Sequence, residues 1–363
     1  MKLRTEQIPA YVLIIIAVFA AVICCLALGT RQKSYAPNFG SKITAAQSTR
    51  RIMERIKEKQ NAEGVIIDPI NDPNQTGFIG SQHSLITTEY GELEAKLTSL
   101  NPNFSALIVQ LLKDAGVKPG DGVAISFSGS FPALNLAVIA ACEALNLKPV
   151  IITSVGASMW GANDPNFTYL DQEKFLFDNG LIKHRTRSAS IGGVEDLGRG
   201  LSPEGRELII KAIARNGLDE IKALDLDGSV QTRMRIYLNS APPVGYRAFV
   251  NVGGGAAALG GVDLPSGIIE PNQNIMNRGV AGEFLRRGVP VINLSDISRL
   301  AQIHNLPIAP IPLPPVGRGK LFYDFRYSVP LAAILAAIML VIIFIVLRLD
   351  VDYYLKRIFK KGA

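Results

Sequence analysis

Two long apolar runs frame this chain of 363 residues. Residues 10–28 (AYVLIIIAVFAAVICCLAL) and residues 327–347 (YSVPLAAILAAIMLVIIFIVL) contain no charged side chain. At a rise of ~1.5 Å per residue, each run can cross a hydrocarbon layer of ~30 Å as a helix. The first run follows Lys2 and Arg4, as a secretory signal does, but it exceeds the ~7–15 apolar residues of such a signal. We therefore predict two transmembrane helices, the first of them an uncleaved anchor.

The basic residues around the second run predict the orientation of both helices. Lys and Arg beside a membrane span stay on its cytoplasmic side. The C-terminal tail, residues 348–363, carries more of them than the segment before the span: Arg348, Lys356, Arg357, Lys360 and Lys361 against Arg318, Lys320 and Arg326. We expect both termini to be cytoplasmic and residues 31–326 to be extracytoplasmic.

Between the two runs, apolar stretches of strand length alternate with helical patterns. Residues 123–127 indicate a buried strand, residues 131–145 a helix and residues 149–153 a second buried strand. This succession with short links is typical of a parallel βαβ unit. The pattern also predicts two helices within 87–116, helices over 202–217, 283–287 and 296–304, and strands over 246–252 and 289–294. The predicted fold class is α/β, with a parallel, Rossmann-like sheet in one domain or two subdomains.

These patterns divide the chain into seven segments. They are a cytoplasmic tail (1–9), a transmembrane helix (10–28), a juxtamembrane helix and linker (29–69), the extracytoplasmic α/β domain (70–305), a proline-rich linker (306–326), a second transmembrane helix (327–347) and a basic cytoplasmic tail (348–363). The juxtamembrane helix carries Ile52, Met53 and Ile56 on one stripe, which fits a solvated helix or one packed against a partner. The proline-rich linker is expected to be an extended spacer.

Charge and cysteine content narrow the classes of function. The formal net charge is +7, but without the two tails the middle region has 31 Lys and Arg against 28 Asp and Glu. The excess of positive charge therefore reflects membrane topology rather than a nucleic-acid partner. Cys142 is the one cysteine of the middle region, and the three histidines are not paired at metal-ligand spacing. We expect no disulfide there, no metal and no cofactor.

A serine-rich bend joins the first predicted strand to its helix. Ser126, Ser128, Gly129 and Ser130 (within SFSGSFP) stand where open α/β sheets bind ligands, because backbone N–H groups converge on that edge. Three interpretations stay open: Ser130 caps the helix with Pro132 in its first turn, the bend binds a carboxylate or phosphate, or Ser128 or Ser130 is a nucleophile. The bend lacks the lysine of a phosphate loop and the Gly-x-Ser-x-Gly order of a hydrolase.

A nucleophilic serine needs a base, and none of the three histidines is placed by the sequence to act as one. His83 lies in a polar loop and is a weak candidate, His184 lies in a basic loop and His304 ends the last predicted helix. Their spacing brings none of them to Ser128. The sequence therefore favours a binding role over an enzymatic one.

Two further segments are candidate ligand-binding sites. Gly253, Gly254 and Gly255 follow a predicted strand directly. Either they form a second backbone cradle that faces the serine-rich bend, or they form a flexible turn or allow close packing of a helix on the sheet. Lys183, Arg185 and Arg187 are the cations best suited to meet carboxylates, although an ordinary basic surface loop has the same composition. Without Gly-x-Gly-x-x-Gly and a following acidic residue, the glycines do not indicate a dinucleotide.

The chain resembles the poly-γ-glutamate system protein family. The stretches that carry the resemblance are DPNQTGFIG (72–80), SLITTEYGELEAKLTSLNPNFSALIVQLLKDAGVKPGD (84–121) and SFSGSFPALN (126–135), together with the layout of two spans around one folded region. The resemblance implies a bacterial cytoplasmic membrane, a γ-linked glutamate polymer and partner subunits for its synthesis and export. It implies no catalytic residue, because none is established for the family.

We therefore expect a membrane-anchored accessory subunit that binds or guides the polymer and holds partner subunits. An extracytoplasmic serine hydrolase or transferase acting on the polymer is the first alternative. A cytoplasmic nucleotide-binding subunit is the second, and it requires the opposite orientation.

Overall fold

The computed structural model describes residues 8–271, 273 and 277–349, and it divides into two compact units. One unit consists of the two ends of the chain, up to Tyr35 and from Tyr323 onwards. The other unit, Ala36–Phe322, is the α/β unit. The predictions for residues 1–7 and 350–363 of the two tails concern residues outside the described ones.

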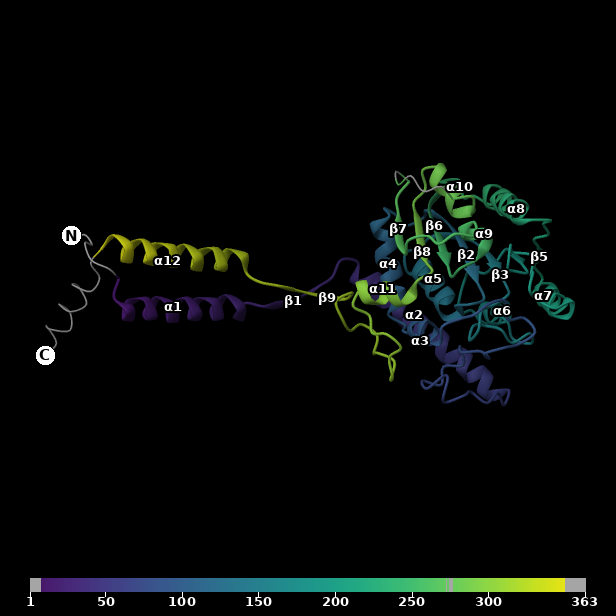
Figure 1. Cartoon of the computed structure of the whole chain (residues 1–363), viewed down its shortest axis with the longest axis horizontal. Coiled ribbons are helices and arrows are strands. Elements are labelled where there is room, and N and C mark those ends of the chain that lie inside the picture. The colour runs from purple at the N-terminus through teal and green to yellow at the C-terminus, as the bar shows by residue number, and fades with distance from the viewer. Residues whose placement is uncertain (1–7, 272, 274–276, 350–363) are drawn as a thin grey trace. The chain divides into compact units, whose positions relative to one another are not determined.

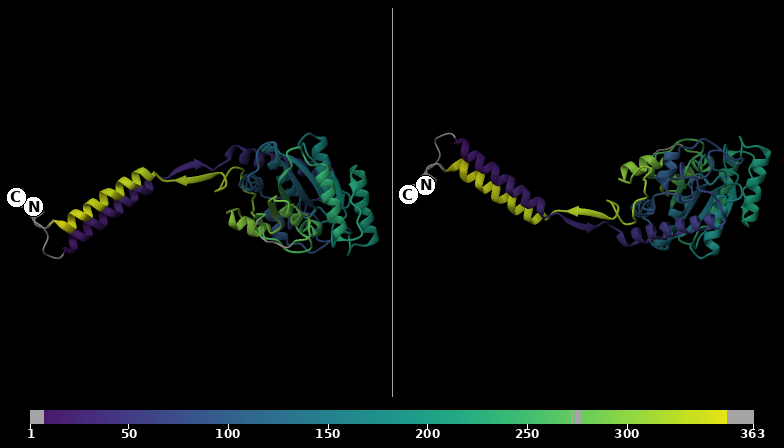
Figure 2. Two further views of the ribbon diagram at one scale, coloured as in Figure 1. Left: turned by 90° about the horizontal axis from the view of Figure 1, so that it is seen from above. Right: turned by 90° about the horizontal axis from the view of Figure 1, so that it is seen from below.

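The unit formed by the chain ends contains two apolar helices and a short ladder. α1 (Ala10–Gly29) and α12 (Val329–Arg348) lie side by side (Figure 2), and both are long and apolar enough to cross a membrane. Both predicted helices are thus present, with ends shifted by one or two residues. β1 (Gln32–Tyr35) pairs antiparallel with β9 (Tyr323–Arg326), a pairing that the short, mixed sequences QKSY and YDFR did not predict.

The α/β unit is built on one sheet of seven strands (Figure 1), in the order β5-β4-β3-β2-β6-β8-β7. Every neighbouring pair is parallel except β7 and β8. The strands are β2 (Gly122–Ser128), β3 (Lys148–Ser154), β4 (Ser188–Ser190), β5 (Asp219–Glu220), β6 (Tyr246–Val252), β7 (Gly267–Ile269) and β8 (Val291–Leu294). The predicted α/β class and the parallel β2–α5–β3 unit are confirmed.

Helices cover both faces of the sheet. On one face, Ala124, Ile152 and Phe249 belong to a core cluster with residues of α8 (Leu226–Asn239), α9 (Ala256–Leu259) and α10 (Val280–Arg286). On the other face, α2 (Phe39–Ala62), α4 (Phe104–Asp114) and α5 (Pro132–Ala144) pack against one another, and α6 (Tyr169–Asp178) continues this layer. Alternate residues of β2 therefore point into two separate apolar layers, which explains its continuous apolar run.

The remaining helices connect the strands and close the edges. They are α3 (Leu93–Ser99), α7 (Pro203–Arg215) and α11 (Ile297–Ile303). The predicted start of α7 is confirmed, since the Ser202 hydroxyl accepts a hydrogen bond from the Gly205 N–H (3.0 Å) and a proline occupies the first turn.

Two segments predicted as linkers belong to the α/β unit. α2 buries Ile52 and Ile56 completely because its apolar stripe packs on α4 and α5, so it is neither solvated nor free for a partner on that face. The proline-rich segment is held to the unit by amide side chains rather than standing off as a spacer. Asn74 donates to the Pro310 carbonyl (2.9 Å), and Asn103 donates to the Pro315 carbonyl (3.2 Å). The unit consequently begins before residue 70 and ends after residue 305.

Candidate functional site

The serine-rich bend leaves the carboxyl end of β2 and is buried. α5 begins at Pro132 with Phe131 as its N-cap and no capping side chain, so the interpretation that Ser130 caps the helix is wrong. The Ser130 hydroxyl oxygen instead accepts hydrogen bonds from the Ser128 hydroxyl (3.0 Å) and the Ser158 N–H (3.0 Å). The bend is therefore tied to the loop after β3. Its serines connect neighbouring strands and do not cap the start of α5.

Gly129 lies in the turn after β2 and allows close packing there. A Cβ atom at this position would lie 2.4 Å from the Val155 carbonyl oxygen, well inside contact distance. The Gly129 carbonyl in turn accepts a hydrogen bond from the Ala162 N–H (2.9 Å). Only a residue without a side chain allows the loops after β2 and β3 to approach this closely.

The structure brings the serine-rich bend and the glycine loop together. Gly253 ends β6 with φ +83°, and a Cβ atom there would lie 3.2 Å from Ser128 Cβ. β2 and β6 are neighbours, and the strand order departs from this pair in opposite directions. Ligands of open parallel sheets bind in the crevice at such a reversal point. Gly254, the next residue, is exposed, so the glycine loop reaches the surface beside this reversal point.

A buried lysine lies behind the bend. The Lys96 ammonium donates to the Ser130 carbonyl (2.6 Å) and to the Ser158 hydroxyl (2.6 Å), and it stands 4.0 Å from the centre of the Phe131 ring. Burial lowers the pKa of Lys96 to about 7, an effect that the nearby Glu89 carboxylate partly opposes. Lys96 is thus a cation that can lose its proton near neutral pH, and one hydrogen bond joins it to Ser130 of the predicted site.

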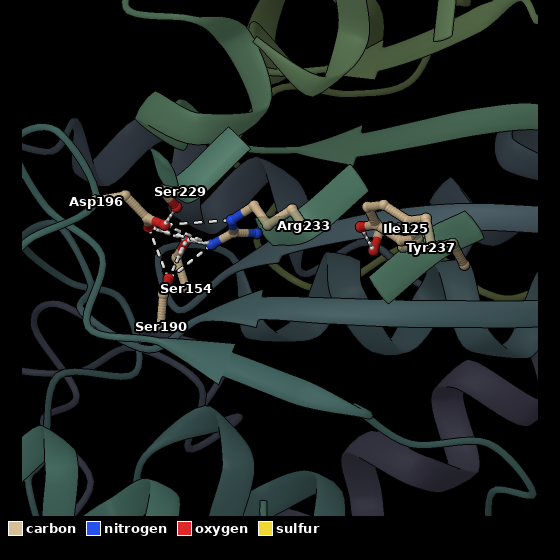
Figure 3. A network of polar contacts seen from close by, with 7 residues as sticks. All are labelled: Ile125, Ser154, Ser190, Asp196, Ser229, Arg233 and Tyr237. Atoms are coloured by element: carbon tan, nitrogen blue, oxygen red, sulfur yellow. Dashed lines mark hydrogen bonds and ion pairs between the residues drawn. The ribbon is translucent and has the colours of Figure 1, made fainter. Parts of the chain in front are cut away.

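A second buried cation, Arg233, lies in a polar network at the ends of two strands (Figure 3). Arg233 of α8 has no exposed surface and is paired with Asp196, at 2.9 Å between Nη2 and Oδ2. The hydroxyls of Ser154 and Ser190, at the ends of β3 and β4, accept hydrogen bonds from the same Nη2 (2.9 and 2.6 Å). Ser229 completes the cluster by donating to Asp196 (2.5 Å). Ser154 pairs in register with Ser128, so this network reaches the strand beside the bend.

One guanidinium nitrogen of this network, Arg233 Nη1, has no hydrogen-bond partner among the described residues. In Figure 3 the side chain extends over the sheet with its other nitrogens directed toward Asp196. The side-chain amide oxygen of Asn251, on β6, is likewise buried without a partner among the residues that the structure describes. Buried donors and acceptors are normally satisfied, so this part of the sheet has unused hydrogen-bonding capacity.

The basic loop lies away from the serine-rich bend and the glycine loop. Lys183, Arg185 and Arg187 precede β4, and therefore lie toward the amino edge of the parallel sheet, opposite the serine-rich bend. The Arg185 guanidinium donates to the Asn216 carbonyl (2.9 Å), and the Lys183 N–H donates to the Glu143 carboxylate (2.6 Å). These contacts fix the loop to α7 and α5.

No histidine occupies a catalytic position beside the serines. His83 is exposed, and within the described part of the chain no hydrogen bond connects His83, His184 or His304 with Ser128 or Ser130. The described part of the chain also contains no group of three or more His, Cys, Asp or Glu side chains placed to hold a metal ion.

Sequence reasoning missed Lys96, Ser158, Asp196 and Arg233. For Lys96 a signal existed: it stands three residues after Leu93 and four before Leu100, on an apolar helical stripe where a lysine predicts a buried ammonium. The Asp196–Arg233 pair had none, because the two residues come from a loop and a helix that only the tertiary fold brings together.

No family model, curated protein or solved structure matches this chain.

Proposed function

We propose that this protein is a membrane-anchored accessory subunit that binds an anionic γ-linked glutamate polymer and holds partner subunits of its synthesis or export. In this proposal α1 and α12 span a bacterial cytoplasmic membrane with both termini inside. The α/β unit, with a Rossmann-like sheet, is extracytoplasmic. The polymer and the partners come from the family resemblance, and the binding site comes from the geometry.

The observation that carries the proposal is the contact between Ser128 and Gly253 at the reversal point of the sheet. The N–H groups of Gly129, Ser130 and Gly253 are bonded within the protein, so the exposed Gly254 is the part of this edge that presents backbone N–H to a carboxylate. The nearby Lys96 is charged in part of the molecules at neutral pH, which favours an anion further. A carboxylate-bearing chain fits this electrostatic environment better than a neutral ligand does.

The crevice can be tested with a synthetic penta-γ-glutamate and the purified full chain in detergent, by isothermal titration calorimetry. Gly254→Leu adds a side chain where nothing lies within 4 Å, so it covers the glycine loop without disturbing the core. We expect affinity to fall by about tenfold or more. The control is a triple Lys183, Arg185 and Arg187→Gln variant, which changes charge at the other edge. A loss of binding in the control but not in Gly254→Leu would assign the polymer to the basic loop.

Orientation is tested with one engineered cysteine. Leu224→Cys places a thiol at a side chain that is 94% exposed, whereas the native Cys142 is buried. In a background with Cys24 and Cys25 replaced by alanine, a membrane-impermeant maleimide should label this thiol in intact cells. Labelling only after lysis would contradict the extracytoplasmic placement and favour the nucleotide-binding alternative.

One observation favours the enzyme alternative. The Lys96 amine lies 2.6 Å from the Ser158 hydroxyl, and a neutral lysine at this distance can accept the proton of a nucleophilic serine. Both side chains are buried, at 3% and 4% exposure. A substrate can therefore reach them only if the residues that cover them move. This is why binding is the first proposal and catalysis the second.

A hydrolysis assay with the same penta-γ-glutamate separates the two. If Ser158 is a nucleophile, Ser158→Ala should reduce the release of glutamate by several orders of magnitude, while Ser128→Ala should leave it nearly unchanged. If the full chain releases no glutamate above background, the enzyme alternative fails and the binding proposal stands.

A further inference from the structure

A separate cavity of about 570 Å³ lies in the α/β unit, between the end of α2 and the loops of residues 64–84 and 160–167. Its volume falls within the range of small-molecule sites, about 300–1,000 Å³. None of the sequence-predicted site residues lines it.

The wall of the cavity is rigid. The Gly80 N–H donates to the Trp160 carbonyl (3.2 Å), and the Trp160 N–H donates to the Ser81 carbonyl (3.0 Å). The Asn163 side chain accepts from the Ser81 N–H (3.0 Å) and donates to the Ser81 carbonyl (2.7 Å). Trp160 is held at φ +64°, a backbone conformation that bulky residues rarely adopt. The two loops therefore form one preformed surface.

The charges of the lining exclude an anion. Asp68 and Asp164 line the cavity, and no Lys, Arg or His does. The pKa of Asp68 is lowered because its carboxylate accepts a hydrogen bond from the Ile70 N–H, so this group is ionised at neutral pH. A glutamate polymer would meet like charge here. The cavity is therefore distinct from the crevice of the proposed function.

A buried amide defines what the ligand must offer. Gln172 of α6 is 3% exposed and lines the cavity, and its Oε1 atom has no hydrogen-bond partner within the described part of the chain. An amide has both a donor and an acceptor to satisfy. The unpartnered Oε1 atom needs a donor, which a hydroxyl or an ammonium group supplies and a carboxylate does not. Hydroxyls can also donate to the lone pairs of Asp68 and Asp164.

Apolar side chains complete the site. Trp160 and Phe167 line the cavity, and Ile66 lines it while being 93% exposed. A pyranose ring has an apolar face beside its hydroxyl groups, which matches this mixture of aromatic, aliphatic and planar polar groups. We propose that this cavity binds an uncharged saccharide, with Gln172, Asp68 and Asp164 meeting its hydroxyl groups and Trp160 its apolar face.

The chain supplies its own reporter for the test, because Trp160 is the one tryptophan in the sequence. The full chain is purified in a zwitterionic detergent, since alkyl maltosides and glucosides carry competing sugars. It is then titrated to ~50 mM with glucose, N-acetylglucosamine, maltotriose and chitotriose, with tryptophan emission as the readout. We expect a saturable change in emission with at least one of these saccharides.

The matched variants are Gln172→Leu and Gln231→Leu. The first removes the amide from the cavity at nearly constant volume, and the second makes the same change at an exposed position of α8. We expect Gln172→Leu to weaken saccharide binding by about tenfold and Gln231→Leu to leave it unchanged. Thermal unfolding of both variants shows that each is folded.

Three results would overturn the proposal. One is the absence of a saturable change with all four saccharides. Another is saturation by spermidine instead, which would assign the cavity to cations. The third is unchanged saccharide binding in Gln172→Leu, which would mean that water alone satisfies this amide.

Discussion

Replacing Lys96 by methionine tests the central electrostatic feature of the site. The ammonium is buried against the Phe131 ring and donates to two acceptors of the loops after β2 and β3. Its pKa in the folded protein is about 7, whereas an unfolded lysine titrates near 10.4. Between these values the unfolded chain binds one proton more than the folded chain does. The free energy of unfolding should therefore rise with pH across this window.

The magnitude follows from the linkage relation. One proton contributes about 1.4 kcal/mol per pH unit, so wild type should gain about 2.5 kcal/mol from Lys96 between pH 7.5 and 9.5. Lys96→Met has no group that titrates here and should lack this gain. Lys174→Met, which removes an exposed lysine of a surface ion pair, should retain the wild-type slope.

Urea unfolding of the full chain, followed by tryptophan emission, measures this difference. Trp160 belongs to the α/β unit, so the signal is independent of the two apolar helices. If wild type and Lys96→Met have the same pH dependence of unfolding free energy, Lys96 titrates normally. The site would then carry a permanent positive charge, and the argument for a proton-accepting lysine would be refuted.

Three further substitutions test the packing around the site, each by urea unfolding. Asp196→Asn should destabilise the protein by about 3–5 kcal/mol by leaving Arg233 unpaired, and an additional Arg233→Met should recover part of the loss. Gly129→Ala should cost about 1–3 kcal/mol, because its Cβ has no space, whereas Gly254→Ala should change stability by less than about 0.5 kcal/mol. Ser202→Ala should cost about 1 kcal/mol through the lost cap of α7; an unchanged midpoint in any of the three would contradict the contact concerned.

The backbone of the site could be predicted because its signals are local. The apolar run before Ser128, the proline at position 132 and the glycines after β6 each mark an element boundary within a few residues. The meeting of Ser128 with Gly253 followed from the rule that loops at the carboxyl edge of a parallel sheet converge. That prediction required the order of elements but no side-chain detail.

The rest depended on tertiary packing. Ser130 had every local property of a cap, yet its hydroxyl bonds Ser128 and the loop after β3, and Phe131 is the N-cap of the helix. The proline-rich segment had the composition of a spacer, but its carbonyl groups find the Asn74 and Asn103 amides. Both differences arise because a hydrogen bond between distant segments outweighed a local preference of comparable size.

The chain enters the α/β unit at Ala36 and leaves it at Phe322, where the Ala36 N–H donates to the Phe322 carbonyl (2.9 Å). If α1 and α12 stay in a bilayer when this unit unfolds, the unfolded chain remains a closed loop of roughly 300 residues instead of one with free ends. In the chain-entropy model such closure removes about 5–6 kcal/mol of unfolded-state freedom. Membrane insertion would then act on this unit as a covalent crosslink does, and a single proteolytic cut near either end would remove that stabilisation while every contact of the fold remained.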